Sequence, residues 1–453
     1  MAIELRGGKT KESTNPFLRF KLRDNPFVSA PVANFAATDP RLRKIFSREA
    51  QKAAIERIEA RWVGTKLFPE RLRVGFLWAQ STDLTDKGMG KSAVLFHVID
   101  RLNDGWGQAY FEDRKVAAVY VYAGTDWNQI GHICIDAMRR LEDIGIIDEV
   151  VRVLRYEVLS AAKHKAVTEF TSEKDLSRLL DYAYLSEHDV DIASLSEGVI
   201  RKLLDAGITE PGLAQAVADQ KYTDFLKSKR SDRQLTVPPK AHDWRLTRES
   251  FRLFFDQSMR IMAAGKFDAC YLFVDDVENI VKNGKTDLRQ FATQLGGALF
   301  RDDVYSNTAG FLSVFLTTHA RAAQMLAKEW RECGYQTRAE LHTQSENSVM
   351  ITRLTIVGAE KMIAEYLHFF RSEVIDDRLF PFDKEAVHAL AEKSQYHPAQ
   401  LLRNCGKVLL QAVEDGIDSV TKEFAMKVLE SSVDGLPNAD GPGADSSFGD
   451  YED

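Results

Sequence analysis

The feature that most constrains this chain is the segment at residues 85–92, which reads Thr-Asp-Lys-Gly-Met-Gly-Lys-Ser. An apolar run at 74–79 precedes it and an amphipathic run at 93–102 follows it, so the pattern predicts a strand, a loop and a helix. Glycines at 88 and 90 let the backbone approach an anion closely, and a helix start offers free N–H groups. The segment therefore predicts a phosphate-binding loop (the phosphate loop). We expect a nucleotide to contact Thr85, Asp86, Lys87, Gly88, Met89, Gly90, Lys91, Ser92 and Ala93.

Two side chains of the phosphate loop have specific expected roles. Lys91 should reach the β- and γ-phosphates of ATP, and the Ser92 hydroxyl should hold Mg²⁺. The usual pattern has its first glycine where Thr85 stands, and Asp83 and Asp86 should repel a triphosphate unless they point away. A glycine turn at a helix start, with no ligand, is the alternative interpretation.

A second informative segment lies at 267–276, where a mostly apolar run ends in two carboxylates, Asp275 and Asp276. A buried parallel strand whose carboxyl end opens onto a metal has this pattern. We expect Asp275 to hold Mg²⁺ and Asp276 to lie near the attacking water, with Glu278 as the alternative base. A strand stopped by acidic turn residues is the competing interpretation. A phosphate loop in the same chain makes this second interpretation less favoured, because phosphate loop and metal-binding acid work together on one nucleotide.

Further apolar runs extend the predicted sheet. Residues 117–123 suit a parallel strand covered on both faces, and 311–316 leads into Thr317, Thr318 and His319. A polar side chain there could orient water or touch the γ-phosphate. Amphipathic spacing predicts the helices, the first with Ser47 as its N-cap. They are expected at 50–62, 93–102, 127–141, 173–185, 195–204, 211–226, 249–264, 287–300, 357–370, 384–391, 398–412 and 421–429.

The N-terminal residues carry two Asn-Pro-Phe triplets, at 15–17 and 25–27. Proline disfavours helix before it, so these segments are expected to be extended. We interpret them as an arm packed on the core by phenylalanines at 17, 20 and 27. A recognition motif for another protein is the alternative.

The composition bounds the class of protein. At 453 residues, with 44% hydrophobic and 28% charged residues, the chain predicts two to three globular domains. It has no run of about 18 apolar residues and no signal-peptide pattern, so we expect no membrane partner. The four cysteines form no C-x-x-C pair, which favours free thiols and a cytoplasmic location.

The net charge of −7 argues against a constitutive nucleic-acid coat. Residues 432–453 carry six acids and no lysine or arginine, so the rest of the chain has a net charge of −1. A local basic groove, and with it DNA binding, stays open. The basic segment at 227–233 is interpreted as a solvated surface rather than a nucleic-acid contact.

These patterns divide the chain into five predicted parts. They are an N-terminal extended arm (1–44), a nucleotide-binding core (45–154 and 251–350), a helical insertion (155–250), a C-terminal helical lid (351–431) and a disordered acidic tail (432–453). The predicted fold class is α/β, a P-loop NTPase core with a parallel sheet.

Taken in order, these motifs resemble those of AAA+ ATPases, above all the origin-recognition-type and STAND-type proteins. The resemblance covers residues 45–150 and 265–430. Residues 46–49 resemble the family's N-terminal box, 88–92 resemble Walker A, and 272–276 resemble Walker B with the Asp-Asp pair of STAND proteins. The resemblance implies an AAA+-type core.

The later family positions are less complete. Either Thr317 or Thr318 takes the sensor 1 place. Ala399 stands where the family carries its sensor 2 arginine, and Arg403, one helical turn later, could substitute and contact the nucleotide. Only a tail follows Leu429, so we expect no C-terminal winged helix and doubt a DNA-loading role.

The resemblance implies an ATPase that uses ATP and Mg²⁺ and works through nucleotide-dependent self-assembly into a homo-oligomer, or through recruitment of other proteins or DNA. An arginine from a neighbouring subunit, Arg301 or Arg321, would complete the site. Hydrolysis should be slow, because Asp276 is shorter than the usual glutamate. The alternatives are a nucleotide-stabilised scaffold or switch with little turnover, and a DNA-remodelling ATPase of a mobile element or phage-defence system.

Overall fold

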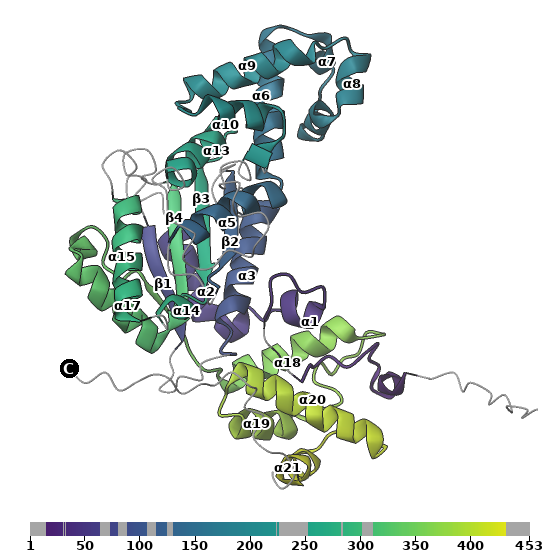
Figure 1. The fold of residues 1–453 in the computed structure, drawn as a ribbon. Helices are drawn as coiled ribbons and strands as arrows, with labels where there is room; N and C mark the ends of the chain where they lie inside the picture. Colours follow the sequence, from purple (N-terminus) through teal and green to yellow (C-terminus); the bar gives the residue numbers. More distant parts are fainter. Residues whose placement is uncertain are drawn as a thin grey trace, which may run out of the picture. The chain divides into compact units, whose positions relative to one another are not determined.

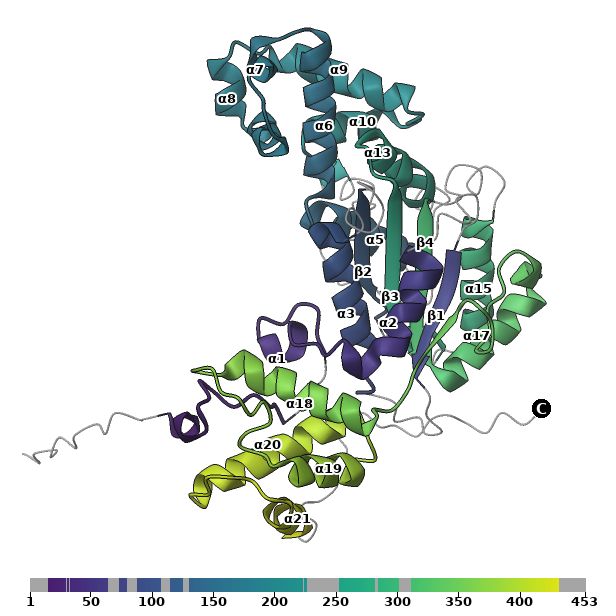
Figure 2. The same cartoon turned by 180° about the vertical axis from the view of Figure 1, so that it is seen from behind.

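The computed structural model describes residues 15–29, 31, 33–63, 73–79, 88–106, 115–124, 130–222, 224–225, 252–281, 284–300 and 311–431 (Figures 1 and 2). The chain forms two compact units. Unit 1 comprises Met1–Ile55, Thr85–Phe96 and Ile351–Asp453, and unit 2 comprises Glu56–Leu84 and His97–Met350. Among the helices that the structure describes, none has the length and apolar character needed to cross a membrane.

A five-stranded sheet forms the centre of unit 2, with the strand order β2-β3-β4-β1-β5 (Figure 1). The neighbours β2 and β3, β3 and β4, and β4 and β1 are parallel. The strands are β1 (Arg73–Ala79), β2 (Val116–Tyr122), β3 (Ala269–Asp275), β4 (Leu312–His319) and β5 (Ser348–Ile351). The predicted α/β class with a parallel sheet is confirmed.

The strand order determines which residues share one edge of this sheet. Strands β2, β3 and β4 lie to one side of β1 and β5 to the other, so the connections reverse direction at β1 and β4. Open α/β sheets bind ligands beyond the carboxyl ends of their strands at such a reversal. Asp275 ends β3 and His319 ends β4 at this edge.

The sheet is buried because its strands are apolar on both faces, as parallel strands covered by helices must be. Every residue of β4 is buried. Helix α5 (Ile130–Asp143) packs on β2, and α17 (Ala320–Glu332) packs on β1 and β4 with α15 (Lys285–Leu299) beside it (Figure 1). Trp62 meets Phe315 of β4 edge to face, with ring centroids 4.8 Å apart.

Short helical segments lead into the strands of unit 2. The turn η3 (Glu59–Val63) carries Trp62, whose carbonyl accepts a hydrogen bond from the Tyr271 hydroxyl at 3.0 Å. A Cβ on Gly75 would lie 2.6 Å from the Trp62 ring, so glycine is required where this indole covers β1. The remaining short elements of the core are α2 (Lys52–Ile58), η4 (Leu102–Trp106), α14 (Glu278–Val281) and η8 (Tyr335–Thr337).

The part of unit 2 between β2 and β3 is mostly helical (Figure 2). Arg155, which is 1% exposed, donates hydrogen bonds to the carbonyls of Leu179 and Ala218 and so joins three helices. The described helices after α5 are α6 (Ile146–Ala161), α7 (Lys165–Thr168), η5 (Glu173–Leu180), α8 (Tyr182–Glu187), α9 (Ile192–Asp205), α10 (Pro211–Ala218), η7 (Arg252–Ser258) and α13 (Met259–Ala264).

Two predicted helix boundaries in this region are wrong. The run predicted as one helix at 173–185 is broken at Asp181, which has extended backbone angles and caps α8 by accepting a hydrogen bond from Ala183 N–H. The helix predicted at 211–226 ends at Ala218, before a turn in which Gln220 has a φ of 57°. In both places a local turn overrides the amphipathic spacing.

Unit 1 contains the C-terminal helices α18 (Ile356–Phe370), α19 (Lys384–Lys393), α20 (Pro398–Glu414) and α21 (Lys422–Ser431). Phe17, Phe20 and Phe27 are buried in the same core as these helices, which agrees with the packed-arm interpretation. The Phe27 ring lies 6.1 Å from the Tyr366 ring, measured between centroids.

The expected extended conformation of the arm is wrong at its first triplet. Pro16 opens a 3-10 helix, η1 (Pro16–Phe20), and the Asn15 side chain accepts a hydrogen bond from Phe17 N–H at 3.0 Å. The second triplet repeats this bond, since the Asn25 side chain accepts from Phe27 N–H, also at 3.0 Å. Each asparagine thus makes a local turn that directs a phenylalanine into the core.

The helical run predicted at 50–62 begins differently from the expectation. Its first turn, η2 (Glu49–Gln51), has Arg48 at the cap position and no side-chain capping bond, so Ser47 is not the N-cap. Instead the Ser47 carbonyl accepts a hydrogen bond from Ala50 N–H. The short helix α1 (Pro40–Arg43) precedes this run, and Asp39 caps it.

Candidate functional site

The described part of the phosphate loop, residues 88–92, belongs to unit 1. Gly88 and Gly90 have φ values of 94° and 98°, which side chains with a Cβ rarely adopt. The helix α3 (Lys91–Arg101) follows at once, and its first hydrogen bond runs from Val94 N–H to the Gly90 carbonyl. The N–H groups of Lys91, Ser92 and Ala93 therefore lie in the first helical turn, where no hydrogen bond within the helix uses them.

Lys91 is unusual for its burial. The residue is only 8% exposed. Among the residues that the structure describes, no carboxylate lies within ion-pair distance of its ammonium group. Burying a cation without a partner is costly, so this position favours an anionic ligand. The predicted contacts Thr85, Asp86 and Lys87 lie outside the described residues.

The start of α20 packs directly on the phosphate loop, within unit 1. Ala399 N–H donates a hydrogen bond to the Gly88 carbonyl at 3.2 Å. A Cβ placed on Gly88 would lie 2.4 Å from the Ala399 Cβ, so Gly88 cannot carry a side chain here without a shift. Arg403 donates to the Ser29 carbonyl at 3.1 Å and to the Gln400 side chain at 3.3 Å. Its predicted nucleotide contact stays a prediction.

Asp275, in unit 2, is held by donors on both carboxylate oxygens. It is 2% exposed. The Tyr120 hydroxyl donates to Oδ2 at 3.2 Å, and the Thr317 hydroxyl donates to Oδ1. Asp276 N–H also donates to Oδ1, at 3.1 Å. Because β3 lies between β2 and β4, the two side-chain donors come from the two neighbouring strands.

The residues after Asp275 turn sharply. Asp276 has a φ of 56°, a left-handed conformation that aspartate tolerates better than most residues. Its N–H also donates to the Thr317 hydroxyl at 3.1 Å, and Val277 N–H donates to the Thr317 carbonyl. Glu278, which is 7% exposed, opens the short helix α14. Both predicted bases therefore lie within three residues of Asp275, on a turn fastened to β4.

The residues at the end of β4 separate into different roles. Thr317 contacts Asp275, whereas the Thr318 hydroxyl lies 3.5 Å from the carbonyl of His319. Successive residues of a strand point to opposite faces, so only Thr317 can face the acids. His319 caps α17 by accepting a hydrogen bond from Ala322 N–H. Arg321 is exposed on the first turn of that helix, and Arg301 lies outside the described residues.

The sequence interpretation missed Tyr120. Burial first, and then the Asp275 carboxylate, raise the pKa of the Tyr120 phenol well above its ordinary value. The group therefore stays protonated at neutral pH and acts as a donor to Asp275. The available signal was a phenol flanked by two valines within the run 117–123, which holds a second phenol at Tyr122.

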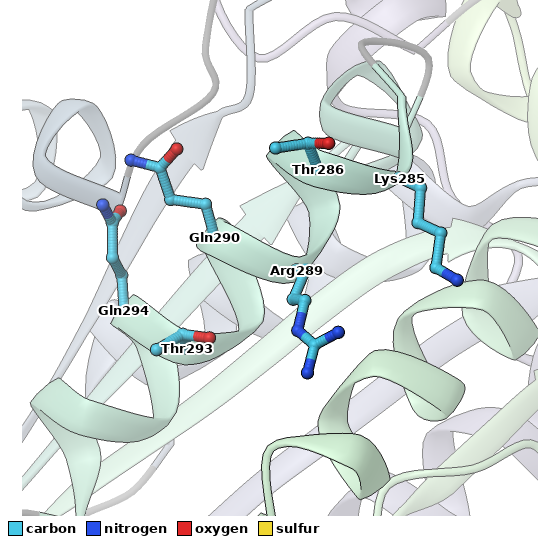
Figure 3. Close-up of a pocket in the computed structure, with 6 residues that line it drawn as sticks. All are labelled: Lys285, Thr286, Arg289, Gln290, Thr293 and Gln294. Atoms are coloured by element: carbon cyan, nitrogen blue, oxygen red, sulfur yellow. The ribbon is translucent and has the colours of Figure 1, made fainter.

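A hollow of about 580 Å³ lies elsewhere in unit 2, along one side of α15 (Figure 3). Figure 3 shows six side chains of this helix around it, and none of them is a predicted site residue. Three are already engaged. Arg289 pairs with Glu332 at 3.5 Å, the Gln294 side chain accepts from Ile130 N–H, and the Thr293 hydroxyl shares a hydrogen bond with the Cys333 thiol at 3.2 Å. The lining residues are Lys285, Thr286, Arg289, Gln290, Thr293 and Gln294.

The described residues contain no group of three or more His, Cys, Asp or Glu side chains that could hold a metal. A dedicated protein cage for a metal is therefore not found in that part of the chain. Mg²⁺ bound with nucleotide phosphates needs only one or two protein ligands, because phosphate oxygens and waters complete its shell. A single carboxylate such as Asp275 fits this kind of site.

Comparisons with known proteins add little evidence about the function of this chain. No protein-family model matches the sequence, and no curated protein matches it. A solved structure that does match is a Walker-type ATPase of Pyrococcus abyssi, with 13% identity and a TM-score of 0.34. The match covers 86% of this chain and 73% of that chain.

Proposed function

We propose that the chain binds Mg²⁺-ATP and hydrolyses it to ADP and phosphate, with the phosphate loop and Asp275 as its two essential parts. The observation that carries the proposal is Lys91, a buried cation with no acidic partner among the described residues, at the start of a helix preceded by two left-handed glycines. A loop of this kind concentrates backbone N–H groups and positive charge on one point. A triphosphate is the anion that this arrangement suits.

The donor types present, a serine hydroxyl and an aspartate carboxylate, are those that Mg²⁺ takes beside nucleotide phosphates. The Ser92 hydroxyl and the Asp275 carboxylate would hold it, and the ion would neutralise charge on the β- and γ-phosphate oxygens. Thr317 orients the Asp275 carboxylate, and either Asp276 or Glu278 would accept a proton from the attacking water. Lys91 would bind the same phosphate oxygens as a fixed positive charge.

Calorimetric titration with ATP tests the proposal. Wild-type protein should bind ATP in the presence of Mg²⁺, and Lys91→Ala should weaken binding by at least about 2 kcal/mol, since an unpaired phosphate charge is left behind. Lys407→Ala is the matched control, because Lys407 is an exposed lysine on α20 of the same unit. Equal ATP affinity of Lys91→Ala and wild type would contradict the proposal.

Turnover and assembly form a finer part of the proposal. We propose that ATP promotes self-association, and that an arginine of a neighbouring subunit, Arg301 or Arg321, completes the hydrolytic site. A switch with little turnover is the alternative, and a steady-state ATPase assay with and without duplex DNA separates the two.

A further inference from the structure

We propose that Tyr120 is a positioning residue that orients the Asp275 carboxylate toward Mg²⁺. The inference rests on the proposed function, because it concerns the same acid. It goes beyond that function by assigning a role to a residue of β2, the strand on the far side of β3 from Thr317.

The strand register explains why Tyr120 can reach Asp275. Tyr122 pairs with Asp275 across the parallel ladder, so Tyr120 lies opposite Phe273, two residues earlier. Residues two apart on a strand share a face, and a long aromatic side chain reaches its diagonal neighbour. Tyr120 is 8% exposed and its hydroxyl lies 3.2 Å from Asp275 Oδ2, whereas Tyr122 is 46% exposed.

The hydrogen bonds to Asp275 leave little freedom to the carboxylate. An ionised carboxylate has about four acceptor sites, two on each oxygen. Oδ1 accepts from the Thr317 hydroxyl and from Asp276 N–H, which uses both of its sites. Oδ2 accepts from Tyr120 and keeps one site. A magnesium ion, or a water bound to it, would therefore meet Oδ2, the oxygen whose orientation Tyr120 fixes.

The Tyr120 hydroxyl donates its hydrogen to Oδ2 at 3.2 Å, and so it limits the directions in which this oxygen presents its remaining acceptor site. Groups that hydrogen-bond to a metal ligand fix the orientation of that ligand, and their loss typically weakens metal affinity or activity about 10–100-fold. Removing the Tyr120 hydroxyl should therefore raise the Mg²⁺ requirement without removing the ligand itself.

The test measures how much Mg²⁺ is needed for half-maximal binding of a fluorescent ATP analogue. Tyr120→Phe should need about 10–100-fold more Mg²⁺ than wild type and should bind the analogue equally well in EDTA. Tyr271→Phe is the matched control. It removes a buried phenol on the adjacent strand, 3% exposed, whose hydroxyl donates to the Trp62 carbonyl instead of Asp275.

Three outcomes would overturn the inference. The first is an unchanged Mg²⁺ midpoint in Tyr120→Phe, and the second is an equal shift in Tyr271→Phe, which would indicate a general effect on the sheet. The third is a wild-type protein that binds no ATP analogue at any Mg²⁺ concentration, which removes the proposed function as well. Thermal melting checks the fold of each variant. If Tyr120→Phe does not fold, Tyr120→Met fills the same space without a donor and is judged by the same midpoint.

Discussion

Gly88 and Ala399 are in close contact where α20 begins. The Ala399 N–H holds the Gly88 carbonyl, and a Cβ on the glycine would meet the alanine methyl at 2.4 Å. Ala399 stands where the sequence resemblance to AAA+ ATPases leads us to expect an arginine, and it makes this close contact with the phosphate loop instead. The sequence alone did not reveal that contact.

An arginine at position 399 should therefore weaken the binding of ATP. We expect Ala399→Arg to weaken ATP binding by about 1–3 kcal/mol, because the larger side chain forces the phosphate loop to shift. Ala399→Gly is the control, since it keeps the N–H donor and adds no atoms. Calorimetry with Mg²⁺-ATP checks both variants, and tighter binding by Ala399→Arg would show that the arginine reaches the nucleotide after all.

At the scale of elements, α15 offers two adjacent glycines in opposite environments. A Cβ on Gly296 would lie 2.1 Å from the Tyr335 ring, whereas a Cβ on Gly297 would have the Tyr335 hydroxyl as its nearest contact, at 3.7 Å. Both positions gain the same helix propensity from alanine, about 1 kcal/mol. Only the packing differs between them.

We expect Gly297→Ala to stabilise the protein by up to about 1 kcal/mol and Gly296→Ala to destabilise it by about 1–3 kcal/mol. Urea unfolding followed by circular dichroism gives both free energies of unfolding. If the two variants unfolded at the same urea concentration, the close packing of Tyr335 on α15 would be wrong.

The sequence predicted these elements where periodicity was strong. Strand β1 matches the predicted apolar run, and α18 and α20 begin within one residue of their predicted starts. The four-residue strand β5 was missed, because such a short run shows no alternation. The helix η1 was missed because proline, which discourages helix before it, favours the first position of one.

The candidate site was only partly predictable for the same reason. The phosphate loop, Asp275 and Thr317 stand at ends of apolar runs, which a sequence pattern can reveal. Tyr120 reaches Asp275 through the pairing of β2 with β3, two strands that lie more than a hundred residues apart in the sequence. Contacts between strands so far apart depend on the sheet register, and no local pattern encodes it.

At the scale of the whole molecule, the prediction concerns assembly. Lys91 is the cation that the motif assigns to the phosphates, and an arginine finger from a neighbour can supply roughly 10³–10⁵ in rate. We expect specific ATPase activity to rise with protein concentration, together with an ATP-dependent increase in mass measured by light scattering. Mixing Arg321→Ala with Lys91→Ala should restore part of the activity if Arg321 is the finger, because each subunit supplies what the other lacks.

Two results would contradict this prediction. One is a specific activity that stays constant over a roughly hundredfold dilution, and the other is a species that remains monomeric with ATP bound. Should only the mixing experiment fail, Arg301→Ala replaces Arg321→Ala in the same design, and failure of both would remove the arginine finger from the proposal.

The paired turns of the N-terminal arm have a consequence for the chemical ageing of the protein. Asparagine usually deamidates when the next backbone nitrogen attacks its side chain, and that attack needs an N–H group. Asn15 and Asn25 both precede proline, which has none. The two amide side chains that direct Phe17 and Phe27 into the core of unit 1 are therefore protected from the commonest covalent damage to asparagine, so storage should leave these turns intact.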